Sequence, residues 1–171
     1  MAQAGFQADP LRIPPDYGER RGLRLQTEAR ELVSVGANPD VRDVRLTPAA
    51  AKAWVRMRDD AAASGIALVA VSGFRSVGRQ AEIIKGKLEA GGTIDAILGA
   101  MAAPGYSEHH TGRAIDIGIP GAPPLTEDFE RTGAFVWLRA NAHRYGFSLS
   151  YPRGNPHGIT YEPWHWLCAA T

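Results

Sequence analysis

The chain has 171 residues, of which 44% are hydrophobic and 22% charged, so it is long enough to bury a core without disulfides or oligomerisation. Nineteen basic and eighteen acidic residues leave a formal net charge of +1, which excludes a global field for holding nucleic acid or an anionic membrane. Cys168 is the only cysteine, which excludes an intrachain disulfide, and its place beside Leu167 favours a small apolar residue over a nucleophile.

Residues 1–22 contain prolines and charges without a helical or strand period, and we expect an extended or partly disordered N-terminal arm. The stretch lacks the apolar core that a signal peptide needs, so either the protein is cytoplasmic or an export signal has been removed. The basic cluster of Arg20, Arg21 and Arg24 is interpreted as solvated surface rather than a binding patch. We expect residues 23–171 to form a single domain, because no repeat or boundary interrupts them.

The first elements alternate between strand and helix. Residues 32–35 form a short strand candidate, rich in valine and closed by glycine. Thr47 followed by proline predicts a helix start, and apolar residues at helical spacing continue to a stop at Gly65. Residues 66–72 are short, apolar and bounded by glycines, which predicts a buried strand. This apolar run is too short to span a bilayer.

Two further helices are predicted over residues 79–88 and 94–101, the second capped by Thr93. Pro104 and Gly105 then break the chain immediately before a histidine-rich stretch.

Residues 113–119 alternate enough to predict a strand, and the proline-rich residues 120–124 predict a loop. A last helix is expected over 132–144, followed by strands at 147–151 and 159–161. This order of elements favours the α+β class, with a small antiparallel sheet packed against several helices.

Candidate metal ligands come from two distant segments: His109 and Asp116 from one, and His165 from the other. A lone histidine before a strand is more often a surface or hydrogen-bonded residue, but here Gly112 allows the loop to turn sharply between the two ligands. Imidazole nitrogen and carboxylate oxygen suit zinc, and three protein ligands leave the fourth tetrahedral position open for water. An open position indicates catalysis, so the pattern predicts a zinc peptidase.

Glu162 stands three residues before His165 and is a candidate base for that water. Pro163 between them lacks an amide hydrogen and disfavours a helix, so the segment is expected to be strand or turn. Residues three apart face opposite sides of a regular strand, so the chain has to bend at Pro163 for both side chains to reach one site. The competing interpretation is a surface glutamate and a histidine packed between Trp164 and Trp166.

The combined motifs resemble a known family. Ser-x-His-x-x-Gly-x-Ala-x-Asp over residues 107–116, followed by Glu-x-Trp-His over 162–165, is similar to the pattern of VanY-type D-alanyl-D-alanine carboxypeptidases. These belong to a larger group with lysostaphin-like peptidases and hedgehog domains. The similarity includes Ser-Gly-Phe-Arg-Ser at 72–76, Tyr-Gly-Phe at 145–147 and Tyr-Pro at 151–152. It covers roughly residues 47–166, with all motifs in order.

The resemblance implies one zinc ion bound by His109, Asp116 and His165, with Glu162 acting as general base and then acid. It also implies an essential Arg75, which either binds the terminal carboxylate of the substrate or stabilises the oxyanion. Three further roles are weaker expectations: Gln80 and Ser107 as groups that hold the substrate, although Ser107 alternatively fixes its loop, and His110 as a residue behind the ligands or on the surface. Manganese, nickel and iron accept the same donors.

The activity implied is removal of the C-terminal D-alanine from peptidoglycan stem peptides, with muropeptides as partners, outside the cytoplasmic membrane. An L,D-carboxypeptidase, a D-Ala-D-Ala dipeptidase and a lytic endopeptidase share this chemistry. Related endopeptidases commonly carry aspartate at the position of Glu162, which favours a carboxypeptidase. A non-catalytic zinc-stabilised binding domain and a metal-free fold are the alternatives from other classes. The sequence departs from close relatives after the Trp-His pair, where an arginine and a tyrosine are missing.

Overall fold

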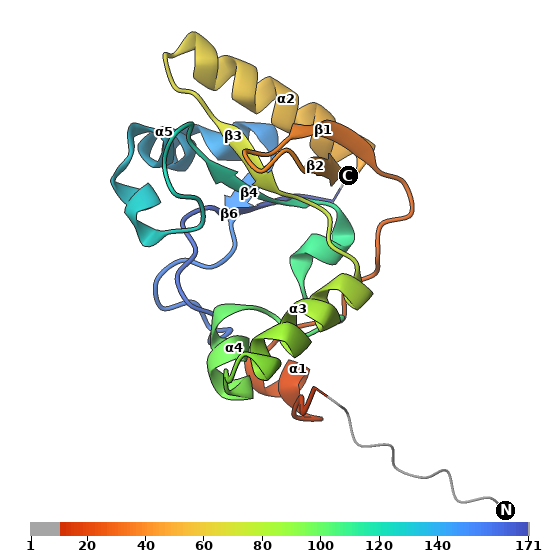
Figure 1. The fold of residues 1–171 in the computed structure, drawn as a ribbon. Coiled ribbons are helices and arrows are strands. Elements are labelled where there is room, and N and C mark those ends of the chain that lie inside the picture. Colours follow the sequence, from red (N-terminus) through yellow and green to blue (C-terminus); the bar gives the residue numbers. More distant parts are fainter. Residues whose placement is uncertain (1–10, 171) are drawn as a thin grey trace, which may run out of the picture.

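The computed structural model describes residues 11–170 (Figure 1). Helices, 3-10 helices (η) and strands follow one another in this order: α1 (Tyr17–Arg21), β1 (Val33–Ala37), β2 (Asp43–Leu46), α2 (Pro48–Ala63), β3 (Val69–Ser72), α3 (Val77–Glu89), α4 (Ile94–Ala100), η1 (Glu108–Thr111), β4 (Ala114–Gly118), η2 (Glu127–Arg131), α5 (Gly133–Asn141), η3 (Ala142–Tyr145), β5 (Phe147–Leu149) and β6 (His165–Cys168). Within this part of the chain, no helix is both long and apolar enough to cross a membrane.

The central sheet has four strands in the order β3-β4-β6-β5, and every neighbouring pair is antiparallel. A separate antiparallel hairpin of β1 and β2 lies beside it. This arrangement confirms the predicted α+β class with a small antiparallel sheet. In the register, Asp116 of β4 is paired with Ser72 of β3 on one side and with His165 of β6 on the other. Opposed residues of neighbouring strands point to the same face of a sheet.

Strand β4 separates the main core from the other face of the sheet. Ile115 and Ile117 are buried in a cluster with Trp54 and Met57 of α2 and with residues of α5 and β6. Because successive side chains of a strand alternate between faces, Asp116 points away from this cluster. The side chains of Ile115 and Ile117 on one face of β4 therefore pack in the core, and the Asp116 carboxylate lies on the other face.

A second cluster joins α1, α3 and α4, which Figure 1 shows grouped below the sheet. Tyr17 and Leu11 are buried there against Ile84 and Leu98, and the Tyr17 hydroxyl accepts a hydrogen bond from the backbone N–H of Ala103 at 3.1 Å. The expectation of an extended or partly disordered arm is wrong for residues 17–21, which form helix α1. The segment is held by this apolar packing and by the Arg21 guanidinium, which donates to the carbonyls of Leu98 at 2.7 Å and Gly158 at 2.9 Å. Residues 1–10 of the expected arm lie outside the described residues.

Several predicted elements occur with changed ends. The helix after Thr47 and the helix capped by the Thr93 hydroxyl are confirmed. The strand expected at 66–72 begins only at Val69, and the last helix continues beyond Asn141 as the 3-10 helix η3. Strand β2 and the 3-10 helices η1 and η2 were not predicted.

The strand expected at 159–161 is absent. Ile159 instead packs in a small cluster with Tyr151 and Ala102, and the backbone N–H of Thr160 donates to the carbonyl of Gly99 at 2.8 Å. These backbone groups are thus bonded to the end of α4 and not to a strand.

Candidate metal centre and active site

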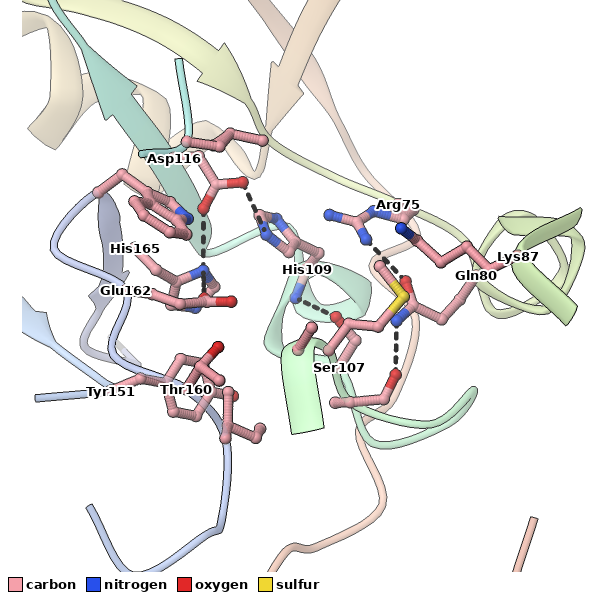
Figure 2. Close-up of a pocket in the computed structure, with 16 residues that line it drawn as sticks. Arg75, Gln80, Lys87, Ser107, His109, Asp116, Tyr151, Thr160, Glu162 and His165 are labelled. Atoms are coloured by element: carbon pink, nitrogen blue, oxygen red, sulfur yellow. Dashed lines mark hydrogen bonds and ion pairs between the residues drawn. The ribbon is translucent and has the colours of Figure 1, made fainter. Parts of the chain in front are cut away.

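The three candidate metal ligands converge at the open face of β4 (Figure 2). His109 Nε2 lies 3.3 Å from one carboxylate oxygen of Asp116, and His165 Nδ1 lies 2.9 Å from the other. All three side chains are buried, and one donor atom from each lies within 4.8 Å of the others. The structure therefore brings together the three residues that the sequence pattern selected from two distant segments.

His109 is oriented by the turn of η1 and by the strand beside it. The Ser107 hydroxyl accepts from the backbone N–H of His109 at the start of η1, and Gly112 ends this helix in the left-handed conformation, with φ of 64°. The Nδ1 of His109 lies 2.7 Å from the carbonyl oxygen of Gly73. Since a carbonyl only accepts, Nδ1 carries the proton, and Nε2 is left free for a metal.

His165 is held by a carboxylate that the sequence reading did not select. Its Nε2 lies 2.9 Å from Glu108 Oε2, and this same oxygen accepts from the Ser150 hydroxyl at 2.6 Å. The ring of Tyr151 lies alongside, with centroids 5.0 Å apart. These contacts turn Nδ1 of His165 toward Asp116, as outer carboxylates do for metal-binding histidines.

The electrostatics of the cluster fit a cation. Burial would raise the pKa of Asp116, but the imidazoles of His109 and His165 hold that pKa well below its ordinary range. Burial lowers the pKa of His165, yet its hydrogen bonds with Asp116 and Glu108 raise that pKa to about 10. The carboxylates therefore stabilise a positive charge between them, and the set of two imidazoles and one carboxylate fits zinc.

Glu162 reaches the same cluster because the chain bends. Residues 163 and 164 form a turn, closed by the His165 backbone N–H donating to the carbonyl of Glu162 at 3.1 Å. The Glu162 carboxylate lies 3.7 Å from His165 Nδ1. Burial raises the pKa of Glu162 to about 7, although the cationic form of His165 opposes the shift. The bend required at Pro163 is present, and the carboxylate is close enough to serve the site.

Arg75 is fixed at three points. Its backbone N–H donates to the carbonyl of His109 at 3.1 Å, its own carbonyl lies 2.6 Å from His110 Nδ1, and its guanidinium donates to Gln80 Oε1 at 2.8 Å. Burial lowers the pKa of Arg75, while the charges of Asp116 and Glu162 raise it. The guanidinium is therefore a positioned positive charge facing the carboxylates.

The three candidate ligands, Glu162 and Arg75 line one cavity of about 360 Å³. Its lining comes from α3, the end of α4, η1, β4 and the segment before β6: Arg75, Gln80, Lys87, Ala100, Met101, Ala102, Ser107, His109, Asp116, Leu125, Tyr151, Ile159, Thr160, Glu162, Trp164 and His165. Volumes of this size are typical of small-molecule binding sites.

A family model described as VanY, D-alanyl-D-alanine carboxypeptidase, matches residues 43–170. The chain belongs to this family. The matched range contains every candidate site residue from Arg75 to His165, so the family motif and the geometric cluster coincide.

Curated relatives are consistent with the VanY family. The putative carboxypeptidase YodJ of Bacillus subtilis is 42% identical over 120 residues, which are 68% of this chain and 43% of the relative. A D-alanyl-D-alanine carboxypeptidase of Enterococcus faecalis is 31% identical over 140 residues, 76% of this chain and 49% of the relative. The chain spans about half the length of these two relatives.

Solved structures share the fold. The LD-carboxypeptidase LdcB matches with a TM-score of 0.75 at 33% identity, over 84% of this chain and 70% of that one. VanYB in complex with D-alanine-D-alanine matches with a TM-score of 0.67 at 26% identity, over 86% and 82%. A VanY D,D-pentapeptidase variant in complex with Zn(II) matches with a TM-score of 0.62 at 25% identity, over 89% and 82%.

The remaining predicted residues are placed as follows. Gln80 is buried, and its amide donates to the carbonyl of Ala102 at 2.6 Å while its oxygen receives Arg75, so it positions the arginine. Ser107 lines the cavity and also caps η1, and its role toward substrate stays a prediction. His110 is fully buried, so the surface alternative for it is wrong. Its Nε2 accepts from the backbone N–H of Gly105 at 3.0 Å.

Proposed function

We propose that this VanY-family chain is a zinc-dependent carboxypeptidase that releases the C-terminal D-alanine of peptidoglycan stem peptides. The observation that carries the proposal is the convergence of His109, Asp116 and His165 with Glu162 in one cavity. The Zn(II) complex of a VanY structure and the D-alanine-D-alanine complex of VanYB support the same metal and substrate class.

Amide hydrolysis is slow because water is a poor nucleophile and the amine is a poor leaving group. Bound by the three ligands, zinc would polarise the scissile carbonyl and lower the pKa of water to about 7. Glu162 accepts the proton of the attacking water and returns it to the departing nitrogen. A carboxylate whose pKa lies at about 7 is suited to both transfers near neutral pH.

Arg75 and Glu108 support this proton transfer without taking part in it. The Arg75 guanidinium, held by Gln80, supplies positive charge where the carbonyl oxygen becomes anionic. Glu108 keeps His165 in the tautomer and orientation that leave Nδ1 toward the cluster. A purely structural zinc would require neither an additional half-buried carboxylate such as Glu162 nor a positioned arginine, which argues against a non-catalytic binding domain.

An L,D-carboxypeptidase is the second candidate. LdcB matches this chain with a TM-score of 0.75 at 33% identity, against 0.67 and 26% for VanYB. The two activities use the same metal centre and differ in the residue that precedes the released D-alanine. The choice between the D,D and L,D activities therefore depends on the part of the cavity wall that contacts the residue before the released D-alanine.

The test is to incubate the purified protein with tripeptide, tetrapeptide and pentapeptide stems, with and without a chelator, and to identify the products by mass spectrometry. Release of one D-alanine from the pentapeptide alone supports the D,D assignment, and release from the tetrapeptide alone supports the L,D assignment. Loss of D-alanyl-D-alanine as a dipeptide or cleavage inside cross-linked peptidoglycan contradicts both. Turnover that survives complete metal removal contradicts the zinc-dependent mechanism.

A further inference from the structure

Lys87 lines the cavity from helix α3, and no step of the hydrolysis uses it. Gln80, Ile84 and Lys87 are spaced by four and three residues, so they share one face of the helix. Gln80 and Ile84 are buried along this face, and Lys87 continues it to the exposed rim. Figure 2 shows the Lys87 side chain extending from α3 toward Arg75 and the cavity.

The charge of Lys87 is not neutralised by a neighbour on its own helix. Arg79 pairs with Glu82 at 2.9 Å, and Lys85 pairs with Glu89 at 3.8 Å. Within residues 11–170, the Lys87 side chain has no hydrogen-bond or ion-pair partner. An unpaired ammonium at the rim of a cavity is a point charge available to an anionic group that enters it.

The two cations of this wall differ in what they can contact. Arg75 is committed to Gln80 and faces Asp116 and Glu162, so its charge is directed at the reacting carbonyl. Lys87 lines the same cavity, is more exposed than Arg75 and extends toward it from α3 (Figure 2). In a carboxypeptidase substrate the residue after the scissile carbonyl ends in a carboxylate, and a peptide whose scissile carbonyl lies beside Arg75 can place that carboxylate near Lys87.

We propose that Lys87 binds the terminal carboxylate of the substrate and is thereby a specificity-determining residue that restricts the cavity to free C-termini. This proposal rests on the proposed function, since it assumes a peptide placed for hydrolysis. The sequence left two roles open for Arg75, and the proposal assigns one to each residue. Arg75 stabilises the oxyanion, and Lys87 binds the terminal carboxylate.

The test compares two probes that differ only at the carboxylate. One is a stem-type peptide with a free C-terminal D-alanine, and the other is the same peptide with a C-terminal amide. Lys87→Met keeps the apolar stem and removes the charge, Lys87→Arg keeps the charge, and Lys85→Met removes a charge from the same helix outside the cavity. Both lysines are exposed, and thermal unfolding verifies that each variant is folded.

For the acid, Lys87→Met should raise KM roughly tenfold, the effect of losing one charge-assisted hydrogen bond, and leave kcat within about twofold. It should leave the amide unchanged. Lys87→Arg should restore most of the preference, and Lys85→Met should match the wild type. Equal effects on acid and amide, or full discrimination without the Lys87 charge, would overturn the proposal.

A binding measurement separates this proposal from the proposed function. In the Glu162→Gln background, which binds without turnover, titration calorimetry reports the acid-over-amide preference directly. If the wild type hydrolyses neither probe but the binding preference falls with Lys87→Met, the role of Lys87 stands and the assigned reaction is wrong. If the wild type hydrolyses the acid and the binding preference survives Lys87→Met, the reaction stands and Lys87 is not the carboxylate site.

Discussion

Glu108 accepts a hydrogen bond from Nε2 of His165 at 2.9 Å, across a separation of 57 residues. The contact joins the 3-10 helix that carries His109 to the strand that carries the third candidate ligand. It fixes both the protonated nitrogen and the direction of the His165 ring, so the candidate metal centre depends on a residue that is not one of its three candidate ligands.

Replacing Glu108 should therefore weaken metal binding without removing a ligand. We expect Glu108→Ala to lower zinc affinity about 10- to 100-fold, the usual cost of losing an outer partner of a metal-binding histidine. Glu108→Gln should lose less, since its amide oxygen still accepts from Nε2. Competition with a chromophoric chelator measures both, with Ser150→Ala as the milder control. Wild-type affinity in Glu108→Ala would show that the contact is dispensable.

Glu162 should be separable from the metal. Glu162→Gln preserves the shape of the side chain but not its basicity, so we expect zinc stoichiometry to be retained while kcat falls about 10²- to 10⁴-fold. Metal content by mass spectrometry and D-alanine release are measured on the same sample. Near-normal turnover in this variant would remove Glu162 from the proton transfer.

Arg75 should affect the rate more than the fold. Arg75→Met removes the charge facing the reacting carbonyl, and we expect kcat to fall about 10²- to 10³-fold, as on loss of an oxyanion donor. Arg79→Met is the matched control, because Arg79 is exposed and pairs with Glu82 away from the metal centre. Steady-state kinetics give kcat and KM for both variants and show whether only Arg75→Met lowers kcat. A rise in KM alone for Arg75→Met would instead assign the arginine to substrate binding.

Gly112 should be required for stability. The backbone at this position has a positive φ of 64°, which is unfavourable for any residue with a side chain. A Cβ atom added there would also lie only 3.0 to 3.1 Å from side-chain atoms of Leu32, Ala29 and Thr47. We expect Gly112→Ala to lower the free energy of unfolding by roughly 2–5 kcal/mol, combining left-handed strain with overpacking. Gly121→Ala has φ of 75° in open space and should cost only about 1–2 kcal/mol. Urea unfolding measures the free energy of unfolding of both variants. Equal losses in the two would show that the close contacts around Gly112 do not contribute to its cost.

The convergence of the three candidate metal ligands could be predicted from sequence because these residues lie in compact motifs. Spacing alone allowed His109 and Asp116 to meet, and the requirement for a bend at Pro163 followed from the missing amide hydrogen and the alternation of strand side chains. The family resemblance then joined these two segments to a third, the one around Arg75. The sheet class followed from the order of short apolar runs and glycines.

The supporting contacts could not be predicted, because they depend on long-range pairing. Nothing near Glu108 in the sequence points to His165, and nothing near His110 points to the carbonyl of Arg75. The expected strand at 159–161 failed for a related reason: Thr160 bonds to the carbonyl of Gly99, and a local pattern does not reveal this competition. Sequence motifs thus predicted candidate reacting groups that the fold brings together, whereas only the fold showed which contacts orient them.

In the proposed mechanism, one metal ion is held jointly by residues of η1, β4 and β6. A crystal structure of the zinc-loaded protein, with anomalous diffraction measured on both sides of the zinc edge, tests it most directly. We expect a single strong peak bonded to His109 Nε2, Asp116 and His165 Nδ1, with Glu162 nearby and not coordinated. A peak elsewhere, or one that lacks any of these three ligands, would contradict it.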